Sequence, residues 1–243
     1  MAARDLGGMI ALKILDHVAV ISLERPDARN ALPTGAWQAL AASIRTIPSS
    51  VRALLLRSMV PGVFCAGADL ADLARLVDDV EARTAFRVAL EDAVGELAGL
   101  SIPTVAAVEG ACFGAGVALA LGCDLIVASP AARFGLPPAR LGIGYPVGDV
   151  ARLAQRVGRA QAARLLFTAT SIDSAEALRI GLVDMIGDAA KVIDDIVRND
   201  ETALWLLKRT LDDPLDESLD AAFEGCFASA RFAAGVAHYR DKA

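Results

Sequence analysis

The feature that most constrains the fold of this chain is the alternation of short apolar runs with amphipathic segments. Short apolar runs of this kind predict strands, and they occur at residues 9–16, 17–24, 51–58, 103–110 and 124–129. The first two runs are adjacent, with a turn expected near Asp16, whereas longer segments separate the others. Strands that alternate with helices form parallel crossover units, so the sequence predicts an α/β core.

Helical spacing of apolar residues predicts what lies between these strands. We expect one helix over residues 34–46 with Thr34 as its N-cap, and two charged helices within residues 69–100. A short apolar helix is expected at residues 115–123, directly after a glycine-containing turn. Each of these helices then connects two of the expected strands.

The character of the sequence changes in its last third. From about Asp149 onward the pattern is mostly helical, with a single short candidate strand at residues 182–186. We therefore divide the chain into an α/β core, residues 1–186, and a helical C-terminal region, residues 187–243. No linker or repeat separates the two parts.

Few residues in this chain are suited to metal binding or to nucleophilic catalysis. The four cysteines are widely spaced among apolar neighbours, which is typical of reduced core thiols in a cytosolic protein: Cys65, Cys112, Cys123 and Cys226. His17 and His238 are the only histidines, too few for a zinc site with ligand spacing, and no GxSxG motif supports a serine triad. We therefore expect no metal.

Charge and hydropathy argue against some classes of binding partner. The 243 residues carry a net charge of −6, which argues against nucleic acid as a partner. The first ten residues do not resemble a signal peptide, and the most apolar stretch, residues 105–121, contains Glu109 and several glycines. We expect a cytoplasmic protein with no membrane partner.

Two turns rich in small residues have the same local pattern. The stretches CAGADL, residues 65–70, and EGACFGAG, residues 109–116, each follow an expected strand and open an expected helix. Small residues allow a ligand oxygen to approach main-chain N–H groups, and two converging amides would stabilise an oxyanion. The alternative is that both are tight turns that need glycine for packing, and spacing alone favours that alternative.

Several motifs in order along the chain resemble one known family. The motifs are ERPDARNAL at residues 24–32, FCAGADL at residues 64–70, EGACFGAG at residues 109–116 and CDL at residues 123–125, followed by Phe134-Gly135 and Leu141-Gly142. Together they resemble the crotonase (enoyl-CoA hydratase/isomerase) superfamily from about residue 10 to the C-terminus. The combination is specific enough to favour the amide interpretation of the two turns.

The resemblance implies a fold, a ligand and an assembly. It implies a spiral of ββα units, a helical trimerisation region, and acyl-CoA thioesters as ligands, with homotrimers or dimers of trimers. No cofactor is implied, because coenzyme A is part of the substrate. The thioester oxygen is expected between the amides of Ala66 and Ala115. The residues that the resemblance places near the ligand are Arg25, Ala28, Arg29, Ala66, Gly67, Ala68, Asp69, Leu70, Gly114, Ala115, Tyr239 and Lys242.

The sequence departs from the resemblance where hydration would need side chains. Family hydratases use two glutamates to transfer the protons of one water, and the matching positions here are Ala118 and Pro138. Ordinary two-glutamate hydration should therefore be absent or very weak. Tyr145 lies in an LGxxY context that resembles family decarboxylases, where it could orient a carboxylate or donate a proton. Alternatively, Tyr145 only packs in its loop. Asp149 is expected to cap the helix that follows.

Two functions from different classes remain. The first is an enzyme that stabilises a thioester enolate and catalyses decarboxylation or double-bond isomerisation with Tyr145. The second is an acyl-CoA binding protein that has kept the pocket and lost the chemistry, which the paired losses at Ala118 and Pro138 favour.

Overall fold

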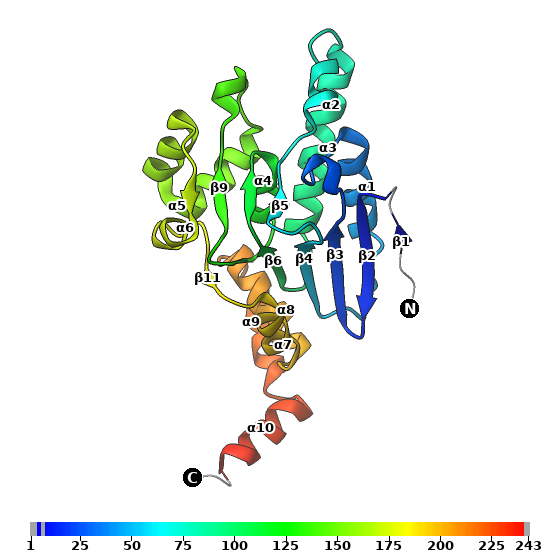
Figure 1. Ribbon diagram of the computed structural model, residues 1–243. Helices are drawn as coiled ribbons and strands as arrows, with labels where there is room; N and C mark the ends of the chain where they lie inside the picture. Colours follow the sequence, from blue (N-terminus) through cyan, green and yellow to red (C-terminus); the bar gives the residue numbers. More distant parts are fainter. Residues whose placement is uncertain (1–3, 6–7, 241–243) are drawn as a thin grey trace.

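A computed structural model describes residues 4–5 and 8–240, and its main feature is a large mixed sheet (Figure 1). The strand order is β1-β2-β3-β4-β6-β8-β11. The strands are β1 (Arg4–Asp5), β2 (Ile10–Leu15), β3 (Val18–Leu23), β4 (Ala53–Ser58), β6 (Thr104–Val108), β8 (Leu125–Ala128) and β11 (Met185–Ile186). The pairs β1–β2 and β2–β3 are antiparallel, and every pair from β3 to β11 is parallel. The predicted α/β core with parallel strands is confirmed.

A second, smaller sheet was not predicted. Its order is β10-β9-β7-β5, with β5 (Val63–Cys65), β7 (Ala111–Phe113), β9 (Arg133–Gly135) and β10 (Ile172–Asp173). Strands β5, β7 and β9 pair in parallel, and each of these three follows a strand of the large sheet within a few residues. Each three-residue strand is too short to leave a periodic signal in the sequence. The result is a repeated strand–strand–helix unit.

Ten α-helices are described. They are α1 (Thr34–Ile44), α2 (Leu70–Arg75), α3 (Val80–Ala98), α4 (Ala115–Leu121), α5 (Val147–Thr168), α6 (Ser174–Arg179), α7 (Ala189–Val197), α8 (Glu201–Asp212), α9 (Leu219–Cys226) and α10 (Ala230–Arg240). The two helices expected within residues 69–100 are α2 and α3, so that prediction is confirmed. The predicted N-cap at Thr34 is wrong: Pro33 precedes the helix, and Thr34 donates through N and Oγ1 to Asp72 instead, at 2.8 and 2.6 Å.

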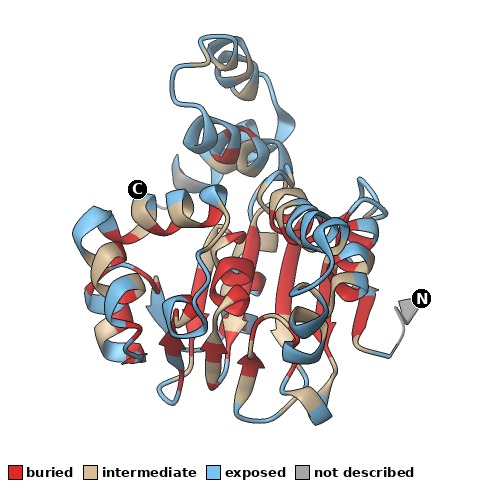
Figure 2. Cartoon of the chain, turned by 90° about the horizontal axis from the view of Figure 1, so that it is seen from above, coloured by how far each residue is buried: buried red, intermediate tan, exposed pale blue. Residues whose placement is uncertain are grey.

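Both faces of the large sheet are covered, but by different parts of the chain. One face packs against α1, α3 and α4 in the main core, whereas Ala189 and Ile193 of α7 pack against the other face. Buried residues lie along the strands and the inner sides of these helices (Figure 2). Trp37 is fully buried in the main core, where its indole N–H donates to the carbonyl of Leu32 at 3.0 Å. The four cysteines are free thiols; Cys65, Cys112 and Cys123 are buried as expected, whereas Cys226 is only partly buried, so the prediction of a core position is wrong for it.

The C-terminal helices α8 to α10 are held to the core mainly by α8. Lys208 of α8 is almost fully buried and donates to Asp124 and to the carbonyl of Ile102, at 2.8 and 2.9 Å. Beyond this anchor, α10 lies away from both sheets (Figure 1). None of the described helices combines the length and apolar character that a bilayer span requires.

Candidate active site

A cavity of about 670 Å³ lies beside the small sheet. Its walls come from four regions: the turn after β3, the turn between β5 and α2, the turn between β7 and α4, and the loop that leads from β9 to α5. All these regions follow the carboxyl ends of strands, where parallel sheets place their ligand sites. This location explains why a cavity forms there.

The two turns of small residues meet at this cavity. Gly67, with φ of +101°, lies so close to the second turn that an added Cβ would be 2.9 Å from the nitrogen of Ala115. An added Cβ on Gly116 would likewise be 2.5 Å from the carbonyl oxygen of Cys65. Glycine is therefore required at both positions because the two main chains are in contact. The packing interpretation of the two turns and their convergence on one site are both true.

The prediction that Ala66 supplies one of the two amides is wrong. The Ala66 N–H donates to the carbonyl of Arg29 at 3.0 Å, so it is already used inside the protein. Ala68 is different. Ala68 forms a parallel β-bridge with Leu32. The Leu32 N–H donates to the carbonyl of Gly67, and the Asp69 N–H donates to the carbonyl of Leu32. The N–H of Ala68 therefore faces the other side of the strand, where it meets no acceptor among the described residues, and Ala68 lines the cavity.

The second amide belongs to the first residue of α4. Ala115 follows Gly114, which has φ of +58°, and the first N–H groups of a helix have no intrahelical acceptor. No described residue accepts from the Ala115 N–H, and Ala115 and Gly114 both line the cavity. The structure thus brings the main chain at Gly67 against the nitrogen of Ala115, and the two residues with unbonded N–H groups, Ala68 and Ala115, line the same cavity.

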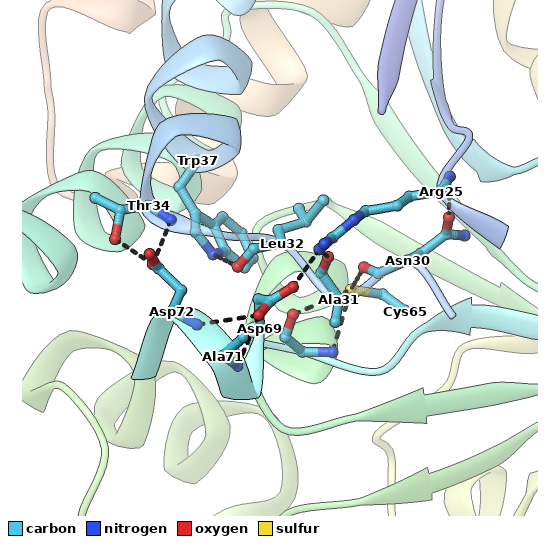
Figure 3. A network of polar contacts seen from close by, with 11 residues as sticks. Arg25, Asn30, Ala31, Leu32, Thr34, Trp37, Cys65, Asp69, Ala71 and Asp72 are labelled. Atoms are coloured by element: carbon cyan, nitrogen blue, oxygen red, sulfur yellow. Dashed lines mark hydrogen bonds and ion pairs between the residues drawn. The ribbon is translucent and has the colours of Figure 1, made fainter. Parts of the chain in front are cut away.

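A polar network fixes the first of these turns (Figure 3). Asp69 caps α2 by accepting from the amides of Ala71 and Asp72, and it pairs with Arg25 at 2.5 Å. Arg25 also donates to the carbonyl of Ala31, and this hydrogen-bonded pair holds the pKa of Asp69 below its usual value. Asn30 is fully buried and donates to the carbonyl of Phe64 at 2.9 Å. The network ties residues 25–32 to the turn that carries Ala68.

This network corrects the role expected for Arg25. Its guanidinium is bonded to Asp69 and Ala31, and Arg25 does not line the cavity. The predicted ligand residues that do line it are Ala28, Arg29, Ala66, Ala68, Asp69, Leu70, Gly114 and Ala115. Gly67 contributes by its close packing rather than as a lining residue. The side chain of Tyr239 and all of Lys242 lie outside the described residues.

Comparison with known proteins identifies the family. The model of the family described as enoyl-CoA hydratase/isomerase matches residues 13–226. A probable mitochondrial enoyl-CoA hydratase 2 of Arabidopsis thaliana is 34% identical over 213 residues, which cover 84% of this chain and 70% of that protein. The chain belongs to the enoyl-CoA hydratase/isomerase family.

Two further comparisons agree with that membership. A mitochondrial methylglutaconyl-CoA hydratase of Mus musculus is 34% identical over 181 residues, covering 71% of this chain but only 57% of the mouse protein's length. A crystal structure described as an enoyl-CoA hydratase/isomerase family protein of Hyphomonas neptunium superimposes with a TM-score of 0.88 at 30% identity, covering 98% of this chain and 97% of that one. The crotonase-type fold is thus confirmed.

Tyr145 brings a hydroxyl group close to Gly114, the residue before Ala115. Its hydroxyl would lie 3.5 Å from an added Cβ on Gly114, and Tyr145 lines the large cavity. Burial, together with the negative charge of Asp149, raises the pKa of Tyr145 above its ordinary value. The hydroxyl therefore stays protonated at neutral pH and can donate a hydrogen bond or a proton into the cavity.

The two positions at which the family resemblance would place hydratase glutamates face different spaces. Pro138 is buried and lines the large cavity. Ala118, on α4, instead lines a separate space of about 10 Å³ next to Tyr145 and Asp149. Neither alanine nor proline can transfer a proton. In the part of the chain that is described, no group of three or more His, Cys, Asp or Glu residues could hold a metal ion.

The prediction that Asp149 caps α5 is wrong. Pro146 occupies the N-cap position, no side chain caps the helix, and Asp149 lies in the first turn with its side chain turned inward. The sequence shows an aspartate near a helix start, which is the usual signal for a cap. It does not show that the start of α5 packs against α4, which is what buries this carboxyl group.

Proposed function

We propose that this chain binds an acyl-CoA thioester and stabilises its enolate with the main-chain amides of Ala68 and Ala115. The observation that carries the proposal is the pair of unbonded N–H groups beside one another at the wall of the large cavity. One such donor contributes roughly 3 kcal/mol to stabilisation of an oxyanion. The relatives that match this chain are hydratases of enoyl-CoA and methylglutaconyl-CoA, which supports a thioester as the ligand.

The reaction that we propose is decarboxylation of a malonyl-type thioester, or double-bond isomerisation, rather than hydration. Hydration requires two proton-transferring side chains, and Ala118 and Pro138 occupy those positions. Decarboxylation needs no base, because the departing CO₂ leaves its electron pair in the enolate. Tyr145 is protonated and next to the amides, so it is suited to donate the proton that the enolate then accepts.

The rest of the ligand is expected to follow the cavity outward. Arg29 and Arg140 line the cavity, are exposed, and have no recorded ion-pair partner among the described residues. Both can therefore contact the phosphates of coenzyme A. The coenzyme A is part of the substrate, and the proposal needs no other cofactor.

We also propose that the chain assembles as a homotrimer or a dimer of trimers, as its family resemblance implies. The support is a set of large apolar side chains that are exposed on the single chain and lie on or between the C-terminal helices: Leu207, Leu211, Leu215, Phe223, Phe227 and Phe232. Apolar surface of this extent marks an interaction site on a soluble protein. Light scattering during gel filtration gives the number of subunits.

The alternative is an acyl-CoA binding protein without catalysis. The specific observation in its favour is the loss of both proton-transferring positions. The test is incubation with methylmalonyl-CoA, malonyl-CoA and crotonyl-CoA, with products followed by mass spectrometry and binding by calorimetry. Loss of CO₂ or migration of a double bond supports the enzyme, binding without turnover supports the carrier, and absence of binding overturns both.

A further inference from the structure

The carboxyl group of Asp149 is buried without an adequate partner. Asp149 is only 5% exposed, and its Oδ2 atom accepts no hydrogen bond from any described residue. Its Oδ1 atom has one long contact, 3.4 Å, to Arg152. A buried carboxylate normally accepts several hydrogen bonds, because leaving one unsatisfied costs about 1–3 kcal/mol or more. An orphaned oxygen of this kind calls for a functional explanation.

The surroundings of this oxygen suggest what it serves. Asp149 lines the space of about 10 Å³ that Ala118 also lines, and that volume is close to the minimum that admits one water molecule. The other walls are apolar except for Tyr145. Among the described residues, Tyr145 alone lines both this space and the large cavity. Tyr145 is therefore the described residue that connects the space beside Asp149 to the large cavity.

We propose that Asp149 is a positioning residue that resupplies the proton of Tyr145 through one water molecule in the space left by the small side chain of Ala118. The proposal rests on the proposed function, because it gives Tyr145 the role of proton donor. It goes beyond that function by assigning a proton source to a site whose expected glutamate positions hold alanine and proline. Asp149, Tyr145 and Ala118 then form one unit.

The proposed step conserves atoms and charge. The bond between the α-carbon and the carboxylate of a malonyl-type thioester breaks, CO₂ leaves, and the electron pair becomes an enolate at the two amides. The α-carbon takes the hydroxyl proton of Tyr145, forming a C–H bond. A proton moves from the Asp149 carboxyl group through the water to the tyrosine oxygen, and Asp149 then regains a proton from solvent.

The charges around Asp149 suit it to this exchange. The pKa of Asp149 is raised to about 6: burial is the main cause, the charge of Arg152 on the same helix lowers it, and the charge of Glu91 of α3 raises it. These two and Tyr145 are the ionisable groups that face Asp149 among the described residues. A carboxyl group with a pKa of about 6 is about half protonated at pH 6 and about one-tenth protonated at pH 7, so it can both give and regain a proton in this range.

The first test uses the protein without substrate. The chain contains only two tyrosines, so labelling with [¹³Cζ]tyrosine gives two signals, and Tyr145→Phe assigns them. The Tyr145 signal should shift with a midpoint near pH 6, following the ionisation of Asp149. Asp149→Asn should abolish that shift, Arg152→Gln should raise its midpoint, and Glu91→Gln should lower it. The exposed Asp194 provides the matched control, Asp194→Asn, which should change nothing.

The outcomes of this test are decisive whether or not the protein turns over a thioester. A Tyr145 signal that does not respond between about pH 4 and about pH 8 overturns the inference, as does a response that persists in Asp149→Asn. Failure of every thioester to bind or react overturns the proposed function and with it the resupply of a proton during turnover, but it leaves the coupling of the two residues in place, because that coupling is measured without ligand.

The second test uses turnover. With a malonyl-type thioester, the turnover number of the wild type should decline as pH rises through about 6. Asp149→Asn should lower kcat by roughly 10²-fold with KM unchanged, and it should remove that pH dependence. An unchanged pH profile in Asp149→Asn would overturn the inference and leave the enolate proposal in place.

Discussion

At one end of the large cavity the polar groups belong to the main chain, whereas on a neighbouring wall, here called the side-chain wall, they belong to side chains. The first end consists of the amides of Ala68 and Ala115, held together by contact of Gly67 with the second turn. The side-chain wall consists of Tyr145, which borders the smaller space that Asp149 and Ala118 also line. The same cavity thus combines two kinds of chemistry that respond differently to mutation.

The two kinds of group differ in how easily a substitution removes them. A main-chain amide is present whatever the side chain is, so only a change of backbone position can remove it. A proton-transferring side chain is lost by one substitution, as we infer for the positions of Ala118 and Pro138. We therefore expect that an added Cβ at the contacts of the first end is not tolerated. Substitutions on the side-chain wall are expected to change the reaction rate rather than the fold.

The largest effect is expected from Gly67→Ala. The added Cβ would be 2.8 Å from the carbonyl oxygen of Phe113 and 2.9 Å from the nitrogen of Ala115, and alanine is strained at φ of +101°. The two turns must separate, so turnover should fall by about 10²- to 10³-fold, as for loss of an oxyanion donor. Steady-state kinetics on the best thioester measures the loss. Gly187→Ala, which meets nothing within 4 Å, is the control that should leave kinetics unchanged.

Tyr145→Phe tests the hydroxyl group of the side-chain wall. The substitution keeps the ring and removes only the hydroxyl, so thioester affinity should remain within about twofold while kcat falls by about 10²-fold. Calorimetry and product formation separate the two effects. Equal turnover by wild type and variant would remove Tyr145 from the reaction and leave the amides as the whole catalytic apparatus.

A smaller effect is expected from restoring a glutamate at position 118. The space beside Ala118 is about 10 Å³, far too small for the added carboxylate, and Asp149 already brings negative charge there. Ala118→Glu should therefore lower the free energy of unfolding by at least about 1–3 kcal/mol without creating hydration of crotonyl-CoA. Ala118→Leu adds similar volume without charge, so denaturant titration of both variants separates crowding from charge. Recovery of hydration by Ala118→Glu alone would contradict this expectation, because it would show that the residues around position 118 can move to accommodate a glutamate.

The two regions also differ in how far the sequence predicts them. The five central strands of the large sheet, β2, β3, β4, β6 and β8, follow from apolar runs and are four to six residues long in the structure, and both helices of residues 69–100 follow from their spacing. The small sheet does not, because strands such as β5 and β7 contain three residues each. It is this small sheet that brings the turn carrying Ala68 to the turn carrying Ala115.

The errors at the site have the same origin. Ala66 and Ala68 look alike in the sequence, and only the pairing of this turn with residues 29 and 32 decides which amide is left unbonded. The family resemblance placed Arg25 near the ligand, and nothing local in the sequence shows its bond to Asp69, 44 residues away. The same resemblance singled out Tyr145, which does line the cavity, while its role in the reaction stays a prediction. Contacts between distant segments thus decide which amide is unbonded and where the Arg25 guanidinium lies.

The smallest effect expected is a pair of opposite pH dependences from the two aspartates of these regions. The pKa of Asp149 rises from 3.8 to about 6 in the folded chain, mainly through burial, so its contribution to stability is complete below about pH 4 and is lost as pH rises through 6. The pKa of Asp69 is lowered, first by its hydrogen bond with Arg25, so its contribution is present above its ordinary pKa and is lost as pH falls through the folded value.

Asp149→Asn should therefore gain stability relative to wild type between about pH 4 and about pH 7, on the order of 2 kcal/mol. Asp69→Asn should lose stability above about pH 4 and approach the wild type in more acidic solution. Thermal unfolding of the three proteins across this range measures both, and profiles of the same sign would contradict the view that Asp149 is an uncompensated buried acid while Asp69 is a paired structural one.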